Sequence, residues 1–215
     1  MADEGYWVCF ITDTLSPSIG SETVARAERV GFELVERTDK EITLRLDEET
    51  TVSITLNLGE SWNWNDPRLI LSFWTKPLQR SGADQGIPDS SESVRDRTET
   101  ILELIVELVK LTEPEYVWSM LNAGPQPDAG LRPTSRPISD SISRLSWVTV
   151  FSEEIVADLG GRDRLLETPA WRVEPIDDSH LIVITRDNPI DPAVEPNNNP
   201  ADFLFADSDI DSDQP

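Results

Sequence analysis

Two neighbouring segments alternate apolar and polar residues so regularly that they restrict the fold more than any other feature of the chain. Apolar residues occupy every second position from Ile42 to Leu46 and again from Val52 to Leu58. A period of two places these side chains on one face of a β-strand and leaves the other face polar. The short acidic connection at residues 47–49 predicts that the two strands form an antiparallel hairpin with one buried face.

Further strand and helix patterns surround this hairpin. Strands are expected at residues 6–12, 32–37, 68–75, 115–121, 145–151, 171–176 and 180–185. Helices are expected at residues 22–30, 93–111, 153–159 and 162–168, with a helical turn near residues 138–143. The helix at residues 93–111 carries a broad apolar stripe with glutamates outside it, which predicts that one side of this helix is buried.

These elements predict an α+β fold with a mainly antiparallel sheet and two or three helices packed on one face. A single domain is expected over residues 1–190. It contains two segments rich in turn-forming residues, a mobile loop at about residues 77–92 and a long loop at about residues 122–137. The Pro, Asn and Asp content of residues 191–215 predicts a disordered acidic C-terminal tail.

Acidic residues are spread over the whole chain and do not form one block. The formal net charge is −23, from 41 acidic and 18 basic residues, and the lysines are Lys40, Lys76 and Lys110. Such self-repulsion destabilises a compact chain in dilute buffer, whereas a Debye length of about 3 Å at 1 M salt screens it. This composition resembles that of haloarchaeal proteins, so we expect a halophilic protein; an acidic protein of a non-halophile is the alternative. The charge argues against nucleic acid or an anionic membrane as a partner.

Few residues can support the common catalytic and metal-binding motifs. Cys9 is the single cysteine and His180 the single histidine, and they lie in different predicted strands. We therefore expect no intramolecular disulfide, no Ser-His-Asp or Cys-His catalytic arrangement and no tetrahedral zinc site. Cys9 is expected in the core, and His180 as an exposed or half-buried structural residue. No catalytic residue, cofactor or metal is assigned. The absence of a leader pattern and of a long apolar run predicts a cytoplasmic protein.

A pair of glycines followed by two arginines, at residues 160–164, raises the possibility of a phosphate-binding loop. The spacing matches neither GxGxxG nor GxxxxGK[ST], so this interpretation has no support. Gly160 and Gly161 instead suit the end of one helix, and Pro169 stops the next one. The segment is therefore predicted to be scaffold.

The residues from Leu145 to Pro192 read LSWVTVFSEEIVADLGGRDRLLETPAWRVEPIDDSHLIVITRDNPIDP. This series resembles an uncharacterised haloarchaeal protein family in which a strand and a helix precede G-R-x-x-L-L-x-x-P-A-W-R-V-E-x-L-D-D-G-G and a final strand ends near D-N-P. It is more remotely similar to the immunity-protein domains of bacterial polymorphic-toxin systems. Ser179 and His180 stand where the family has paired glycines. The resemblance implies a cytoplasmic, non-enzymatic α+β protein that occludes a toxin, and it implies no particular binding residues.

Aromatic residues are the candidate partner-binding sites. Trp62 and Trp64 alternate with asparagines in a predicted loop, and Phe203 and Phe205 belong to the apolar part of the tail. Exposed tryptophans are frequent binding hot spots. Alternatively, the tryptophans cover the end of the sheet, and the tail docks on its own fold.

The sequence therefore favours a non-catalytic, cytoplasmic protein-binding module of a halophilic archaeon, of an immunity- or antitoxin-like kind, with another protein as its partner. Two other classes stay open. One is a small carboxylate-dependent, metal-assisted hydrolase, since carboxylates are abundant. The other is a lineage-specific stress or structural protein.

Overall fold

The computed structural model describes residues 5–58, 63–79, 91–122, 130–190 and 200–205. Nine strands form one sheet in the order β2-β3-β4-β5-β1-β6-β7-β9-β8, and all neighbouring pairs are antiparallel. The strands are β1 (Gly5–Ile11), β2 (Glu33–Arg37), β3 (Glu41–Arg45), β4 (Thr51–Leu56), β5 (Leu69–Trp74), β6 (Tyr116–Asn122), β7 (Val148–Ser152), β8 (Arg172–Pro175) and β9 (His180–Ile184). The helices are α1 (Ile19–Arg29), α2 (Ser91–Thr112), α3 (Glu153–Asp158), α4 (Arg162–Leu166) and α5 (Pro200–Phe205), with short 3₁₀ turns η1 (Lys76–Leu78) and η3 (Ile138–Asp140).

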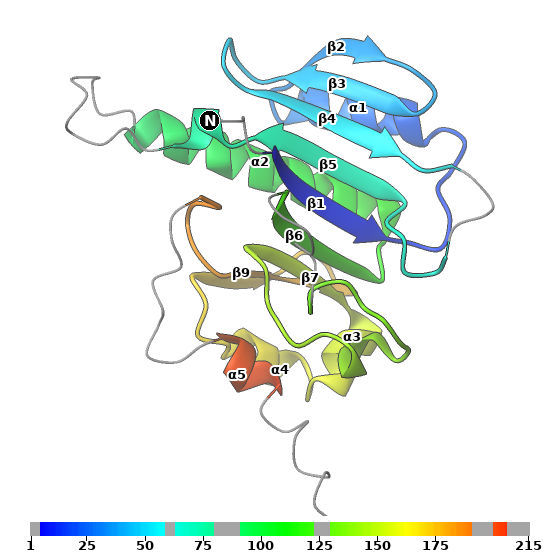
Figure 1. Cartoon of the computed structure of the whole chain (residues 1–215), viewed down its shortest axis with the longest axis vertical. Helices are drawn as coiled ribbons and strands as arrows, with labels where there is room; N and C mark the ends of the chain where they lie inside the picture. Colours follow the sequence, from blue (N-terminus) through cyan, green and yellow to red (C-terminus); the bar gives the residue numbers. More distant parts are fainter. Residues whose placement is uncertain (1–4, 59–62, 80–90, 123–129, 191–199, 206–215) are drawn as a thin grey trace, which may run out of the picture.

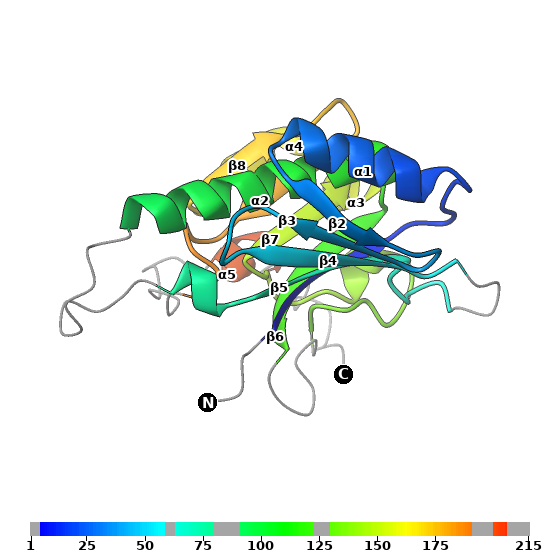
Figure 2. The same ribbon diagram turned by 90° about the horizontal axis from the view of Figure 1, so that it is seen from above.

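Helices lie against both faces of this sheet. Figures 1 and 2 show α1 and α2 together on one face of the strands from β2 to β1. The short helices α3, α4 and α5 lie with β7, β8 and β9 in the other half of the molecule, where they cover the opposite face (Figure 1). The predicted α+β class and mainly antiparallel sheet are confirmed. The two longer helices share a face as expected, and the three short helices add a layer on the other side.

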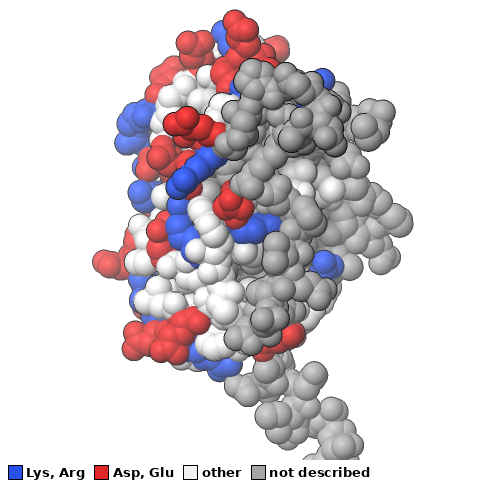
Figure 3. Space-filling view, turned by 90° about the vertical axis from the view of Figure 1, so that its left-hand side faces the viewer, with Lys and Arg blue, Asp and Glu red and all other residues white. Residues whose placement is uncertain are grey.

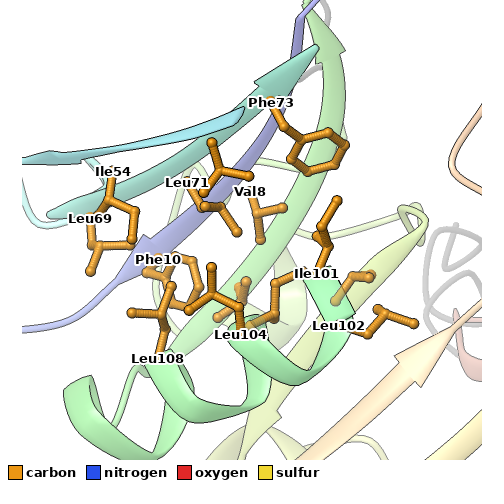
Figure 4. Close-up of a cluster of buried hydrophobic side chains, with 14 of the residues drawn as sticks. Val8, Phe10, Ile54, Leu69, Leu71, Phe73, Ile101, Leu102, Leu104 and Leu108 are labelled. Atoms are coloured by element: carbon orange, nitrogen blue, oxygen red, sulfur yellow. The ribbon is translucent and has the colours of Figure 1, made fainter. Parts of the chain in front are cut away.

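The first core cluster fills the space between the sheet and α2. Val8 and Phe10 of β1 and Leu71 of β5 point toward Leu104 and Leu108 of α2 (Figure 4), and all five side chains are fully buried. The buried stripe on α2 is the one that the sequence predicts. Since full burial of an apolar side chain of this size contributes about 1.5–3 kcal/mol, this layer supplies much of the stability of the fold.

The second core cluster lies on the other face of the same sheet. Cys9 of β1 and Tyr116 of β6 alternate with residues of the first cluster and pack with side chains of the short helices, including Ile155, Leu165 and Leu204. Cys9 is buried, as its apolar surroundings in the sequence predict. The sheet is therefore sandwiched between two apolar layers where its two halves meet.

The predicted hairpin consists of β3 and β4. Ile42 lies opposite Ile54, and both are fully buried on the α1 and α2 side. The carboxylate of Asp47 closes the turn, because it accepts the backbone N–H groups of Glu49 and Thr50 at 2.9 and 2.7 Å. A side chain thus satisfies the backbone donors that the turn leaves unpaired.

Gly160 and Gly161 join α3 to α4, with φ angles of 97° and 93°. Glycine adopts this left-handed backbone without the steric penalty that other residues meet. The arginines that follow are engaged with the protein itself: Arg162 donates to the carbonyl of Asp178 at 2.6 Å, and Arg164 to that of Phe203 at 3.2 Å. The predicted helix end at these two glycines is confirmed.

Six residues of the predicted disordered tail, 200–205, form α5, in which Leu204 is only 3% exposed. This part of the tail packs on the second core cluster because its apolar residues contact the apolar side chains of that cluster. Residues 191–199 and 206–215 of the tail, residues 80–90 of the predicted mobile loop and residues 123–129 of the predicted long loop lie outside the described residues. None of the described helices is long and apolar enough to cross a membrane.

Candidate functional site

Of the four residues predicted to bind a partner, Trp62 lies outside the described residues, and Trp64 is the exposed one among the other three. Trp64 is 40% exposed, and the guanidinium carbon of Arg136 lies 4.8 Å from the centre of its ring. Arg136 also donates to both carboxylate oxygens of Glu115, at 2.9 and 2.8 Å. The indole is thus held at the surface by a cation that is itself fixed by an ion pair.

Phe203 and Phe205 are half-buried in α5, where they pack against the second core cluster. The guanidinium carbon of Arg164 lies 6.0 Å from the centre of the Phe203 ring. Figure 1 shows α5 well away from the connection between β4 and β5, which carries Trp64. The structure therefore does not bring Trp64 together with Phe203 and Phe205, and it places these two phenylalanines against the protein's own second core cluster.

A depression of about 400 Å³ lies at one end of the sheet. The acidic residues that line it are Asp13, Glu113, Glu115, Glu153 and Glu154, and we call it the acidic depression. Glu115 is partly buried, and the other four residues are exposed. Within the described part of the chain, Glu115 is the only one of these five acidic residues that forms a salt bridge.

The antiparallel register explains why these carboxylates meet. Ile11 at the end of β1 lies opposite Tyr116 at the start of β6, and Tyr116 lies opposite Phe151 near the end of β7. Ser152 at the end of β7 lies opposite His180 at the start of β9. Four strand ends therefore form one row, and the acidic residues that adjoin three of them face a common space.

His180 forms part of the wall of the acidic depression and is buried, with 4% of its surface exposed. Its Nε2 lies 3.1 Å from the carbonyl oxygen of Pro114, and its Nδ1 lies 3.0 Å from Oδ1 of Asp177. Each ring nitrogen therefore lies within hydrogen-bond distance of an oxygen that can accept a hydrogen bond. The sequence led us to expect an exposed or half-buried histidine; the ring is buried because two acceptors enclose it.

Asp177 also explains how the β8–β9 turn forms without paired glycines. Its Oδ1 accepts the backbone N–H groups of Ser179 and His180 at 2.8 and 2.7 Å. Partial burial opposes ionisation of Asp177, but these hydrogen bonds and the His180 ring outweigh it and hold the pKa of the carboxyl below its usual value. The ionised Asp177 side chain thus stabilises a turn that lacks paired glycines.

The acidic depression is suited to a cationic group. Exposed carboxylates without a salt bridge can accept hydrogen bonds from an ammonium or a guanidinium group. Ser152 adds a buried hydroxyl that has no hydrogen-bond partner among the described residues. No group of three or more His, Cys, Asp or Glu side chains in the described residues is arranged to hold a metal ion.

Sequence reasoning missed this depression because it treated the acidic residues as a dispersed solvated shell. The available signal was position: Asp13 follows one strand, Glu113 and Glu115 precede another, and Glu153 and Glu154 follow a third. These positions predict a common site only when the order of the strands is known. That order depends on pairing between segments that are distant in the sequence.

Comparisons with known proteins bear on the fold. No protein-family model matches the sequence, and a search of curated proteins found no match. Among solved structures, the fold is similar to that of the Pseudomonas aeruginosa T6SS protein PA0821, with a TM-score of 0.51 and 13% sequence identity. The similarity covers 94% of this chain and 71% of that chain. At this identity, the similarity shows a shared fold.

Proposed function

We propose that this protein is a non-catalytic binding module that recognises a basic segment of a protein partner through the acidic depression and Trp64. The observation that carries the proposal is that five acidic residues from three chain segments line one depression. Arg136 links the depression to the aromatic anchor, since it pairs with Glu115 and stacks on Trp64. Carboxylates supply charge-assisted hydrogen bonds to lysine or arginine, and an exposed indole supplies apolar contact area.

The composition supports a protein that works at high salt, as in the cytoplasm of a haloarchaeon. Figure 3 shows acidic and basic residues interspersed over one side of the molecule, although the chain as a whole carries a net charge of −23. At about 1 M salt the Debye length is about 3 Å, so attraction acts only between groups in contact. The partner must then insert a cationic side chain into the depression and bury apolar surface on Trp64.

An immunity- or antitoxin-like inhibitor is the role that this surface supports best. Residues 145–192 resemble the haloarchaeal family and, more remotely, immunity-protein domains. One solved structure with a similar fold is named a T6SS protein, which is compatible with a toxin-related role. In this role the basic segment belongs to a toxin, and the module occludes it. A gene for a basic toxin beside the gene for this protein is the expected genomic arrangement.

The test is cross-linked capture of a partner in molar KCl by the wild type, Trp64→Ala and Trp171→Ala. Trp171 is 43% exposed and does not line the acidic depression, so it is a matched control. We expect one protein to be captured by the wild type and by Trp171→Ala, with cross-links that map a basic segment to the acidic depression. Trp64→Ala is expected to weaken capture by about tenfold, which corresponds to about 1.4 kcal/mol. Equal capture by Trp64→Ala, or cross-links that map elsewhere, contradict the proposal.

A further inference from the structure

A second hollow, of about 380 Å³, lies on the face of the sheet opposite α1 and α2. In Figure 1 this face of β4, β5 and β1 is turned toward the viewer, and α2 passes behind the strands. The residues that line the hollow include Gly5, Trp7, Ser53, Ser72, Trp74 and Asn122. We call it the neutral hollow because none of the described residues that line it is charged.

The register of the sheet builds this hollow. Ser72 of β5 lies opposite both Ser53 of β4 and Trp7 of β1, and Gly5 of β1 lies opposite Trp74 of β5. Residues two apart in a strand share a face, so the two indoles stand diagonally on one face with small residues beside them. A Cβ atom at Gly5 would lie 3.8 Å from Nε1 of Trp7. The missing side chain of Gly5 therefore leaves open the space between the indoles.

The lack of charge identifies the kind of ligand. The chain carries a net charge of −23, and yet the described residues that line this hollow present aromatic rings, hydroxyl, amide and backbone groups and no charged side chain. An ionised ligand would give up hydration here and find no opposite charge. A purely apolar ligand would leave the hydroxyl and amide groups without partners. The fitting ligand is uncharged, with an apolar face for an indole and several hydroxyl groups at its edge.

A sugar ring has this combination of surfaces. Its C–H groups, polarised by neighbouring oxygens, face the electron-rich side of an indole, and its equatorial hydroxyls reach polar side chains around the ring. Trp74 is 55% exposed and is therefore accessible for stacking. Ser72 Oγ already donates to the carbonyl of Ser53 at 3.2 Å, so its lone pairs are left to accept from a ligand hydroxyl. Asn122 adds both a donor and an acceptor.

We propose that the neutral hollow is a binding site for an uncharged carbohydrate, with a sugar ring stacked on Trp74 and its hydroxyls bonded to Ser53, Ser72 and Asn122. This site is distinct from the acidic depression. The inference is therefore independent of the proposed protein-binding function.

Titration with cellotriose and maltotriose, followed by tryptophan fluorescence in about 2 M KCl, tests the site. Sugar concentrations of up to about 20 mM detect a Kd of about 1 mM. We expect at least one of the two trisaccharides to bind. Trp74→Ala is expected to weaken binding at least about tenfold, because it removes the stacking surface, whereas Trp171→Ala leaves binding unchanged.

Gly5→Thr is a second variant that keeps both indoles and fills the space between them. It is expected to weaken binding of the trisaccharide while the thermal unfolding temperature stays near that of the wild type. The anionic trisaccharide trigalacturonate is expected not to bind. The proposal is overturned if neither neutral trisaccharide binds, if Trp74→Ala binds as tightly as the wild type, or if cyclohexanol binds in place of both sugars.

Discussion

At the scale of single residues, buried polar groups in this protein differ sharply in how well they are paired. His180 is enclosed by two acceptors, while the Tyr116 hydroxyl is buried without a hydrogen-bond partner among the described residues. Burial raises the pKa of the Tyr116 hydroxyl far above its usual value. The sequence predicted a structural role for His180, but pairing of this kind depends on neighbours that are distant in the chain.

The two buried tyrosines give a matched comparison. Tyr6 contacts Ser119 Oγ at 3.5 Å and interacts with Arg186, whereas Tyr116 has no such partner. Tyr6→Phe is therefore expected to lower the free energy of unfolding by about 1 kcal/mol. Tyr116→Phe is expected to leave it unchanged or raise it by up to about 1 kcal/mol, since it removes an unpaired buried hydroxyl. Chemical denaturation measures both, and an equal loss in the two variants would show that Tyr116 is hydrogen-bonded after all.

Asp47 links stability to pH. Burial opposes its ionisation, but Arg97 and the turn N–H groups outweigh burial and lower the pKa of the carboxyl. A lowered carboxyl pKa contributes stability above the unfolded pKa of about 3.9, and this contribution is lost as the pH falls through the folded pKa. Asp47→Asn is expected to cost about 1 kcal/mol at pH 7, because Asp47 is partly solvent-screened.

Denaturation of the wild type and Asp47→Asn from pH 7 to pH 2 measures this linkage. The difference in the free energy of unfolding between the two proteins is expected to be constant above about pH 5 and to shrink below about pH 4. Measuring the difference removes the general relief of acidic repulsion, which both proteins share. A difference that is independent of pH down to pH 2 would contradict the role given to the carboxylate.

At the scale of secondary-structure elements, most of the fold could be predicted from local patterns. The β3–β4 hairpin follows from alternating apolar residues, and α2 follows from its apolar stripe. The acidic depression could not be predicted in this way, because it needs β6 to lie between β1 and β7. The docking of α5 also depends on a distant partner surface, and the composition of residues 191–215 points only to disorder.

The docking of α5 rests on Leu204. Leu204→Ala removes a side chain that is 3% exposed, and it is expected to release α5 while the sheet stays folded. Hydrogen exchange is expected to become at least about tenfold faster in residues 200–205 and to stay unchanged in β1 and β5. Leu166→Ala is the control, because that side chain is 42% exposed. Unchanged exchange in α5 after Leu204→Ala would show that other contacts hold the helix.

At the scale of the whole molecule, charge sets the conditions under which the protein is stable. The net charge of −23 opposes folding at low ionic strength, and molar salt screens it. The unfolding temperature is expected to rise by about 10 °C between 0.1 and 2 M KCl, which corresponds to about 3 kcal/mol for a chain of this length. Sucrose, which does not screen charge, is the control. Equal unfolding temperatures in dilute buffer and in molar KCl would contradict the halophilic interpretation.

The same net charge means that any basic ligand is attracted to this molecule, so recognition must be separated from general attraction. Glu153→Gln/Glu154→Gln removes two charges from the acidic depression. Glu28→Gln/Glu36→Gln removes two exposed charges elsewhere and leaves the net charge of the two variants equal.

The most direct test of the binding surface is the Kd of a hexa-arginine peptide for the wild type and these two double variants in about 1 M KCl, where long-range attraction is screened. We expect Glu153→Gln/Glu154→Gln to weaken binding about tenfold and Glu28→Gln/Glu36→Gln to change it by less than about twofold. Equal weakening by the two double variants would contradict recognition at the acidic depression.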